Sequence, residues 1–273
     1  MAKLKFSKQQ KTIQELDAIE ELYGGEFTRS KLVRILLMYS IIPLAFGMLL
    51  YRSILWTGIW IAITCIYSFA KVIPGNIKMD YNMKAHNQRN RVINVITQSL
   101  ASGNTSVKQG IKMAVDNTDG ELHSDMAKLY AKLLGDPTPE ATHQAFLALE
   151  EKYKEDVFFS LFLEQLEVGV GRAHPDIRTL VVFRESHNTE FSEIKKYREG
   201  KRKQLKMVVV MLFIAFSTCL IAALMLTYKK WVVLYNHSLA GFIITTIFMC
   251  ALFKILDRFT TQYQDDSINS IKL

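Results

Sequence analysis

Four stretches of this sequence contain no Asp, Glu, Lys or Arg, and each is long enough, or nearly so, to cross a lipid bilayer. They are residues 35–51, 53–70, 207–228 and 231–253. At 1.5 Å per residue, the last two would extend over about 33–35 Å, more than the ~30 Å hydrocarbon core. The first two, with 17 and 18 residues, lie at the lower limit of length. Only Arg52 separates the first pair, and only Lys229 and Lys230 separate the second. This tight pairing predicts two transmembrane hairpins rather than buried helices of a soluble core.

The basic residues indicate the side of the membrane on which each loop lies. Of the 34 Lys and Arg residues, 31 fall in residues 1–34, 71–206 and 254–273, and only three lie at the hairpin tips. Because basic residues near a span are retained on the cytoplasmic side, we expect both termini and the middle region to be cytoplasmic. The first span follows a charged segment, so we do not expect a cleaved signal peptide.

The middle region shows helical periodicity and almost no strand-like alternation. Apolar residues recur at helical spacing in successive sets: Val92, Ile96 and Leu100; Ile111 and Val115; Leu122, Met126, Leu129 and Leu133; Phe146, Leu149 and Tyr153; and Ile177, Leu180, Val181 and Phe191. The connections between these sets are short, which favours antiparallel neighbours. The pattern predicts a bundle of about five or six helices.

The fold class is therefore expected to be all-α, an integral membrane protein in which two hairpins flank a cytoplasmic helical bundle. The expected domains are an N-terminal amphipathic segment (1–34), the first hairpin (35–70), the bundle (71–206), the second hairpin (207–253) and a cytoplasmic tail (254–273). Within the first segment, residues 7–23 read as an amphipathic helix. That helix can lie on the bilayer surface, dock on a partner or dock back onto the bundle itself, and the sequence leaves these alternatives open.

Three glycines, Gly103, Gly135 and Gly171, mark the breaks between bundle helices. Each is followed shortly by a polar residue or a proline that can open the next helix. Glycine is favoured in the left-handed conformation that often ends a helix. We therefore expect left-handed caps at these three positions.

Small residues recur every four positions in two of the spans. They are Ala215, Cys219 and Ala223 in the third span, and Gly58 and Ala62 in the second. Small side chains at this spacing let helix backbones approach closely. The pattern predicts helix packing at both places.

A dense basic cluster immediately precedes the third span. It consists of Lys195, Lys196, Arg198, Lys201, Arg202, Lys203 and Lys206. Its position next to a span favours a role in topology and contact with anionic headgroups of membrane lipid. The other basic residues are dispersed despite a net charge of +8, so no nucleic-acid partner is expected.

No motif predicts catalysis, a metal or a cofactor. The segment Gly103 to Gly110 resembles a phosphate loop superficially, but six residues separate its glycines instead of four, and no Lys-Ser/Thr pair follows. The three cysteines all lie in spans and show no ligand spacing. The histidines of the middle region, among them His86 and His187, show none either, so we expect ordinary bundle residues. The chain is expected not to be an enzyme.

Several stretches of the middle region carry a resemblance to a known family. They are residues 91–103 (RVINVITQSLASG), residues 106–114 (SVKQGIKMA), residues 134–147 and residues 158–180. Together with the arrangement of spans, they resemble the F-domain family, the platform proteins of type II secretion, type IV pilus and Tad pilus machines, with Tad-type members closest. The family usually has Gly, two residues and Leu where this chain runs from Gly169 to Pro175, so the turn before the last helix differs.

The resemblance implies a non-enzymatic platform in the bacterial cytoplasmic (inner) membrane. Such proteins bind a cytoplasmic hexameric ATPase and couple it to the assembly of pilin or pseudopilin subunits. It also implies a homo-oligomer or a pairing with a paralogous platform protein. A helix continuous from Pro175 into the third span would serve as a stiff lever.

Two other classes of function stay open. A stator subunit of a proton-driven motor, of the MotA or ExbB type, shares the plan of two spans, a cytoplasmic domain and two spans. Those subunits typically carry a proline in each of the last two spans, whereas the last proline of this chain is Pro175. A membrane scaffold or sensor without an attached machine is the third class.

Overall fold

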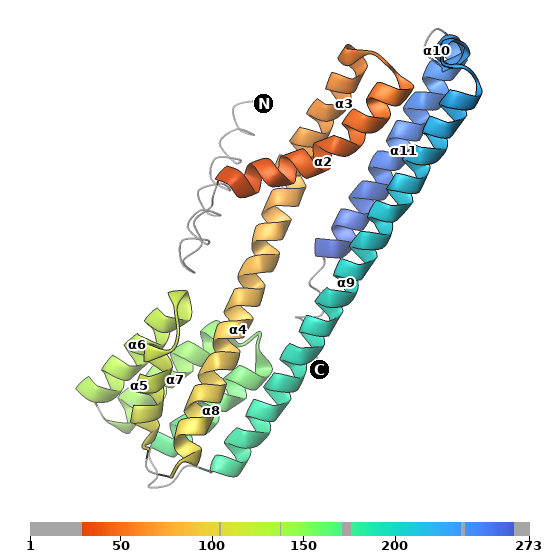
Figure 1. The fold of residues 1–273 in the computed structure, drawn as a ribbon. Helices are drawn as coiled ribbons and strands as arrows, with labels where there is room; N and C mark the ends of the chain where they lie inside the picture. The colour runs from red at the N-terminus through yellow and green to blue at the C-terminus, as the bar shows by residue number, and fades with distance from the viewer. Residues whose placement is uncertain (1–28, 104, 137, 171–175, 236–237, 265–273) are drawn as a thin grey trace, which may run out of the picture. The chain divides into compact units, whose positions relative to one another are not determined.

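The computed structural model describes residues 29–103, 105–136, 138–170, 176–235 and 238–264, and these residues contain helices and turns but no strand (Figure 1). The helices are α2 (Arg29–Leu50), α3 (Ile54–Tyr67), a π-helical turn (Ser68–Val72), α4 (Ile73–Ala101), α5 (Val107–Asp116), α6 (Gly120–Gly135), α7 (Pro139–Tyr153), α8 (Val157–Val170), α9 (Ile177–Met225), α10 (Tyr228–Tyr235) and α11 (Leu239–Gln264). The all-α prediction is confirmed for this part of the chain. The predicted helix at residues 7–23 and the predicted cap at Gly171 lie outside it.

The described residues form two compact units. The first, here called the helical unit, is Asp80–Tyr197, and the second, here called the apolar unit, comprises residues 29–79 and 198–264. Helices α4 and α9 contribute residues to both units. The six helices α4 to α9 supply the helical unit, in agreement with the predicted five or six.

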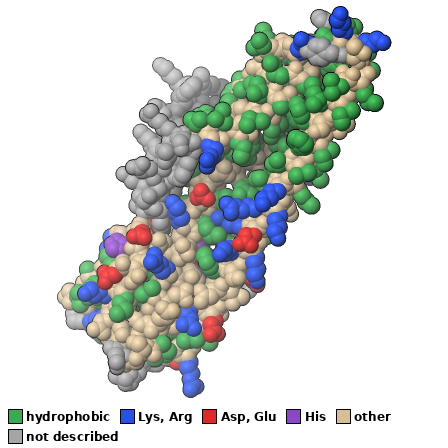
Figure 2. All heavy atoms as spheres, in the orientation of Figure 1, with side chains coloured by type: hydrophobic (Ala, Val, Ile, Leu, Met, Phe, Trp, Pro, Cys, Tyr) green, Lys and Arg blue, Asp and Glu red, His purple; other side chains and the backbone are tan. Residues whose placement is uncertain are grey.

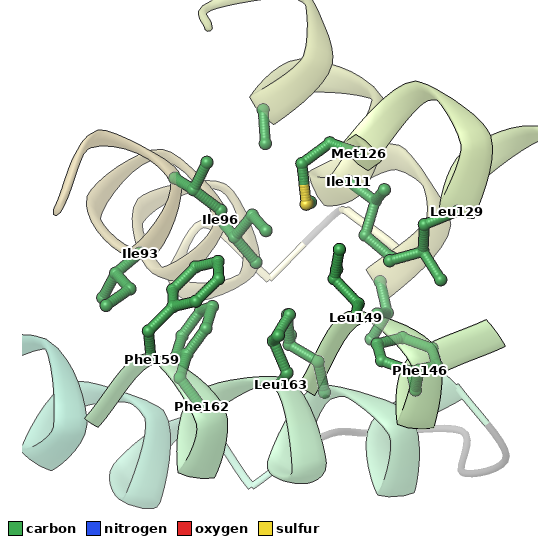
Figure 3. Close-up of a cluster of buried hydrophobic side chains, with 14 of the residues drawn as sticks. Ile93, Ile96, Ile111, Met126, Leu129, Phe146, Leu149, Phe159, Phe162 and Leu163 are labelled. Atoms are coloured by element: carbon green, nitrogen blue, oxygen red, sulfur yellow. The ribbon is translucent and has the colours of Figure 1, made fainter. Parts of the chain in front are cut away.

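The helical unit encloses its own hydrophobic core. Figure 3 shows Ile93 and Ile96 of α4 facing Phe159 and Phe162 of α8, with Ile111, Met126, Phe146 and Leu149 completing the cluster from α5, α6 and α7. All of these side chains are buried. The predicted apolar sets supply most of this core: among their members, Val92, Ile96, Leu100, Ile111, Leu122, Met126, Leu129, Leu133, Phe146, Leu149 and Leu180 are buried. Helical periodicity therefore identified the buried faces correctly.

The helix ends match the predicted breaks only in part. Gly103 has a φ of 77°, as a left-handed cap requires, and Ser106 then opens α5 with a reciprocal capping box to Gln109. Gly135 is the last helical residue of α6 and does not have a positive φ, so the left-handed cap predicted there is wrong. The Leu133 carbonyl instead accepts a 2.9 Å hydrogen bond from Lys108 of α5, which satisfies a group that the cap would have served.

Among the described residues, four helices are long and apolar enough to span a membrane. The first is α2, and the second runs from α3 through the π-helical turn into α4. The other two are α9 and α11. Figure 2 shows the hydrophobic side chains gathered on the surface of the apolar unit. The last of these helices begins at Leu239, later than residue 231, because Ser238 caps it by accepting a 3.0 Å hydrogen bond from the Gly241 N–H.

The π-helical turn between α3 and α4 has a local cause. Pro74 follows it and has no backbone N–H to donate to the carbonyl four residues earlier, and its ring would collide with that carbonyl. A wider i→i+5 turn relieves this conflict without ending the helix. The second predicted span therefore continues into the first helix of the helical unit.

Candidate functional site: a buried ion cluster and its pocket

Asp156 is the centre of a buried polar cluster in the helical unit. It directly precedes α8, and its Oδ1 atom accepts a 3.0 Å hydrogen bond from the backbone N–H of Phe159. Capping of this kind satisfies one of the N–H groups that the first turn of a helix leaves unpaired. The local sequence thus holds the carboxylate at the amino end of α8 and leaves its Oδ2 atom for other helices.

Side chains from α4 and α9 converge on that oxygen. Arg89 Nε donates to Asp156 Oδ2 at 2.6 Å, the Nε2 atom of His187 lies 3.3 Å away and the Nδ1 atom of His86 lies 3.5 Å away. The two imidazole rings stack with their centroids 4.6 Å apart. The side chains of His86, Asp156 and His187 are 6%, 7% and 0% exposed. The cluster therefore ties three helices together inside the unit.

A second hydrogen bond defines the tautomer of His187. Its Nδ1 atom lies 3.0 Å from Nδ2 of Asn90, and an amide nitrogen can only donate. Nδ1 therefore accepts, and the proton on Nε2 is the one directed at Asp156. Asn90 also donates to Asn188 at 2.7 Å, and Asn188 donates to Asn94 at 3.1 Å. A ladder of amides thus links α4 to α9 next to the ion cluster.

The cluster keeps Asp156 charged. Burial alone would raise the pKa of its carboxyl group, but the hydrogen bonds from His187 and His86 and the charge of Arg89 outweigh burial and hold that pKa well below its usual range. Glu190 on α9 behaves in the opposite way, because burial and the charge of Asp156 raise its pKa. The same site thus contains one carboxylate that resists protonation and one that accepts a proton more readily.

A pocket of about 250 Å³ adjoins the cluster within the helical unit. Besides His86, Arg89 and Asp156 of the cluster, its walls include Tyr81, Glu121, Lys152 and Glu155. Lys152 Nζ lies 2.7 Å from the carboxylate of Glu121, and the Tyr81 hydroxyl donates to the same carboxylate at 2.9 Å. The pocket therefore presents charges of both signs on packed helices, an arrangement suited to polar contacts with another protein.

The donor atoms resemble a metal site, but the geometry argues for an ion pair. The ligand atoms of His86, Asp156 and His187 all lie within 4.8 Å of one another, and this ligand set is one that Zn²⁺ accepts. Arg89, however, already bonds Asp156 Oδ2 at 2.6 Å and supplies the positive charge. A metal ion would have to displace this guanidinium. We therefore interpret the cluster as an ion pair that holds α4, α8 and α9 together.

Sequence reasoning missed this cluster. His86 and His187 were expected to be ordinary bundle residues, and that expectation needs correction because both are buried in one ion-paired group. The three residues that meet are far apart in the sequence and come from separate helices. The one local signal was Asp156 immediately before the apolar start of α8, which indicates a cap but says nothing about its partners.

The juxtamembrane basic cluster divides into exposed and inward-facing members. Arg198 donates to the Met79 carbonyl at 2.9 Å, and Lys201, which is 8% exposed, donates to the Tyr263 carbonyl at 3.3 Å. The other five, Lys195, Lys196, Arg202, Lys203 and Lys206, are exposed. Only these five have side chains available for lipid headgroups.

The small residues that were predicted to pack in the spans fall into two groups, one packed in the apolar unit and one exposed. Ala223 is buried in the core of the apolar unit, and Ala215 and Cys219 pack against that core. Gly58 and Ala62 are exposed, and a Cβ at Gly58 would meet no atom within 4 Å. The packing predicted there is not found within the apolar unit.

A close contact between α2 and α3 occurs at a different glycine. A Cβ at Gly47 would lie 2.9 Å from Thr57 Cγ2. No repeat of small residues marks this position, because the contact joins a single glycine to a threonine on the neighbouring helix.

The part of the chain that the structure describes is therefore all-helical, with four helices long and apolar enough to span a membrane and a separate helical unit with a buried ion cluster. No family model matches the chain, and no solved structure matches it. An uncharacterized protein of Bacillus anthracis is 28% identical over 269 residues, which are 95% of this chain and 93% of that protein. The similarity therefore extends over both units.

Proposed function

We propose that this chain is the inner-membrane platform protein of a type II secretion, type IV pilus or Tad pilus-like machine. In that role it couples a cytoplasmic hexameric ATPase to the assembly of pilin or pseudopilin subunits. The observation that carries the proposal is the two-part architecture: a helical unit with its own closed core shares the unbroken helices α4 and α9 with a unit built from spanning helices. The resemblance of residues 91–180 to the F-domain family supports the same function.

The proposed topology has two transmembrane hairpins, at residues 35–70 and 207–253. The N-terminal segment, residues 71–206 and the tail then lie in the cytoplasm of a bacterial cell. The support is the distribution of Lys and Arg, 31 of which lie outside the spans and their tips. With this topology the helical unit faces the ATPase, and almost no residue faces the other side.

The pocket beside Asp156 is the surface where we expect the ATPase to bind. Glu155 is exposed on its wall, so reversal of its charge should weaken a polar interface without disturbing the core. Glu151 lies four residues earlier, near the end of α7, is 74% exposed and does not line the pocket. The variants Glu155→Lys and Glu151→Lys are therefore a matched pair.

The test is affinity purification of the tagged full chain in mild detergent, with co-purifying proteins identified by mass spectrometry. We expect a hexameric ATPase and pilin-like proteins with the wild type and with Glu151→Lys, and at least severalfold less ATPase with Glu155→Lys. Recovery of a single-span protein with a membrane carboxylate would instead identify a stator subunit. Recovery of neither set would leave a scaffold or sensor and would contradict the platform proposal.

The stiff lever expected from the sequence, helix α9, is part of the platform proposal. Helix α9 runs without interruption for 49 residues, a length of about 74 Å at 1.5 Å per residue. A Gly-Pro insertion after Gly200 would break its hydrogen bonding. We expect the insertion to abolish pilus or pseudopilus assembly while the protein still reaches the membrane. Intact assembly would exclude the lever and leave the platform function standing.

A further inference from the structure

A groove of about 470 Å³ lies within the apolar unit, lined by α2, α9 and α10. Ile41, Leu44 and Met48 line it from α2, and Phe216 and Trp231 line it from the other two helices. The three α2 side chains are about half exposed. A mostly apolar groove of this size can hold part of a small amphiphilic ligand.

One polar atom in this apolar lining has no partner. Trp231 is 5% exposed, and its indole N–H is buried without a hydrogen-bond partner among the described residues. A buried donor that is left unsatisfied is unfavourable, and more so in a membrane, where water cannot replace the missing acceptor. A ligand that brings an acceptor to this point would remove that penalty.

Arg52 adds a positive charge to the same groove. It lies between α2 and α3 and has a φ of 47°, in the left-handed region that disfavours residues with a Cβ. Glycine would adopt this conformation at lower cost. An arginine at a strained position points to a role for its side chain, and the guanidinium is well suited to bind phosphate through paired N–H donors.

We propose that this groove binds one anionic phospholipid. Its phosphate accepts hydrogen bonds from Arg52 and from the Trp231 indole, and an acyl chain lies against the apolar side chains of α2. A transmembrane helix of another protein suits the groove less well, because close helix contacts favour small residues and the lining residues here are large. The proposal does not depend on the platform function or on the leaflet in which the groove lies.

The test uses the full chain purified in detergent and exposed to an equimolar mixture of dioleoyl-phosphatidylglycerol and dioleoyl-phosphatidylcholine. Native mass spectrometry then counts the lipids retained. For the wild type we expect one retained phosphatidylglycerol, preferred about tenfold over phosphatidylcholine, because both lipids carry the phosphate but choline adds a positive charge that Arg52 repels; tenfold corresponds to about 1.4 kcal/mol.

Two variants and one control distinguish lipid binding in the groove from general electrostatic attraction of anionic lipid to the protein. Arg52→Gln should remove the preference for the anionic lipid. Trp231→Phe, which keeps an aromatic ring and removes only the N–H donor to the phosphate, should reduce the retention of phosphatidylglycerol at least threefold. Lys230→Gln removes a charge adjacent in sequence to Trp231, at a position that does not line the groove, and should leave the preference unchanged.

Three outcomes would overturn the proposal. The first is equal retention of both lipids by the wild type. The second is an equal loss with Lys230→Gln and Arg52→Gln, which would show diffuse attraction instead of a site. The third is a stoichiometric small membrane protein, retained with no lipid and lost with Trp231→Phe, which would show that the groove binds a helix of a partner.

Discussion

The two units differ in where their large apolar side chains lie. In the helical unit many of them are fully buried, among them Ile93, Phe146 and Phe162. In the apolar unit many large apolar side chains are outside, such as Phe213 at 70% and Met225 at 83% exposure, while Thr57, Thr64 and Thr245 are buried. Apolar burial stabilises a unit only when the alternative is water, so this difference is the one expected if the helical unit lies in water and the apolar unit in lipid.

The apolar unit holds its helices together by other means. The Tyr51 hydroxyl lies 3.0 Å from Thr246 Oγ1 of α11, and the indole N–H of Trp60 donates to Tyr51 at 3.3 Å. A further ion pair joins Lys71 to Asp257 at 2.6 Å. Where lipid tails are as apolar as Leu, helix association depends on such hydrogen bonds and on close packing. The comparison therefore predicts that equivalent substitutions will have different effects in the two units.

The largest effect is expected from a cavity in the helical unit. Phe162→Ala removes a fully buried ring and should cost about 3–5 kcal/mol, whereas Phe213→Ala removes an exposed ring of the apolar unit and should change little. The measurement is limited proteolysis of the purified full chain during a thermal ramp, with fragments assigned to each unit. Similar losses for both variants would remove the distinction between the units.

Neutralising the centre of the ion cluster should have the next largest effect. Asp156→Asn keeps a capping side chain but leaves Arg89 without its buried counter-ion, at a cost of about 3 kcal/mol. The same proteolysis assay, read on fragments of the helical unit, measures the loss.

The pH dependence gives an independent check on Asp156. Because its pKa is depressed in the folded state, its contribution is fully present above the unfolded pKa of about 4 and is lost as the pH falls toward the folded value. Asp156→Asn should lack that acid-dependent component. Asp136, whose pKa is also lowered by hydrogen bonds from Thr138 but which is fully exposed, provides the control Asp136→Asn. An equal change in the two acid profiles would contradict a special role for Asp156.

A smaller effect is expected where α2 and α3 are in close contact. Gly47→Ala places a methyl group 2.9 Å from Thr57 and should cost about 1–3 kcal/mol through overpacking. Gly58→Ala meets no atom within 4 Å and should be neutral or slightly stabilising, since alanine favours helix. Thermal unfolding of the apolar unit in detergent distinguishes the two. A greater loss for Gly58→Ala would show that Gly58 contacts another copy or a partner.

The smallest effect is expected at the turn between α9 and α10. Thr227 has a φ of 61°, which is unfavourable for a β-branched residue. Thr227→Gly should therefore stabilise the turn by about 1 kcal/mol. A rise of a few degrees in the unfolding temperature of the apolar unit would support this, and a fall would mean that the threonine side chain makes a contact that outweighs the backbone strain.

Much of the fold followed from local patterns. The charge-free stretches located the helices that are apolar enough to span a membrane, and a period near four residues identified buried positions such as Ile96, Met126 and Leu149. Capping was predicted well at Ser106, where a polar side chain acts within its own turn. It was predicted wrongly at Gly135, because a lysine from α5 satisfies the helix end there.

The candidate sites depended on contacts between helices and were not predicted. No spacing in the sequence relates His86, Asp156 and His187, and no small-residue repeat marks Gly47. The groove beside Arg52 and Trp231 likewise combines residues from separate helices. Such sites depend on how each helix is rotated about its axis and on its register against its neighbours.

The sequence by itself determined which segments are helical, which are apolar enough for a membrane and which face of each bundle helix is buried. These are properties of a window of a few turns, where hydrophobic spacing and charge decide the outcome. The tertiary structure alone decided that Asp156 meets Arg89 and two histidines, and that Gly47, not Gly58, is the close contact. The reason is physical: packing of whole helix surfaces sets the partners of each side chain, and that packing depends on residues far away in the chain.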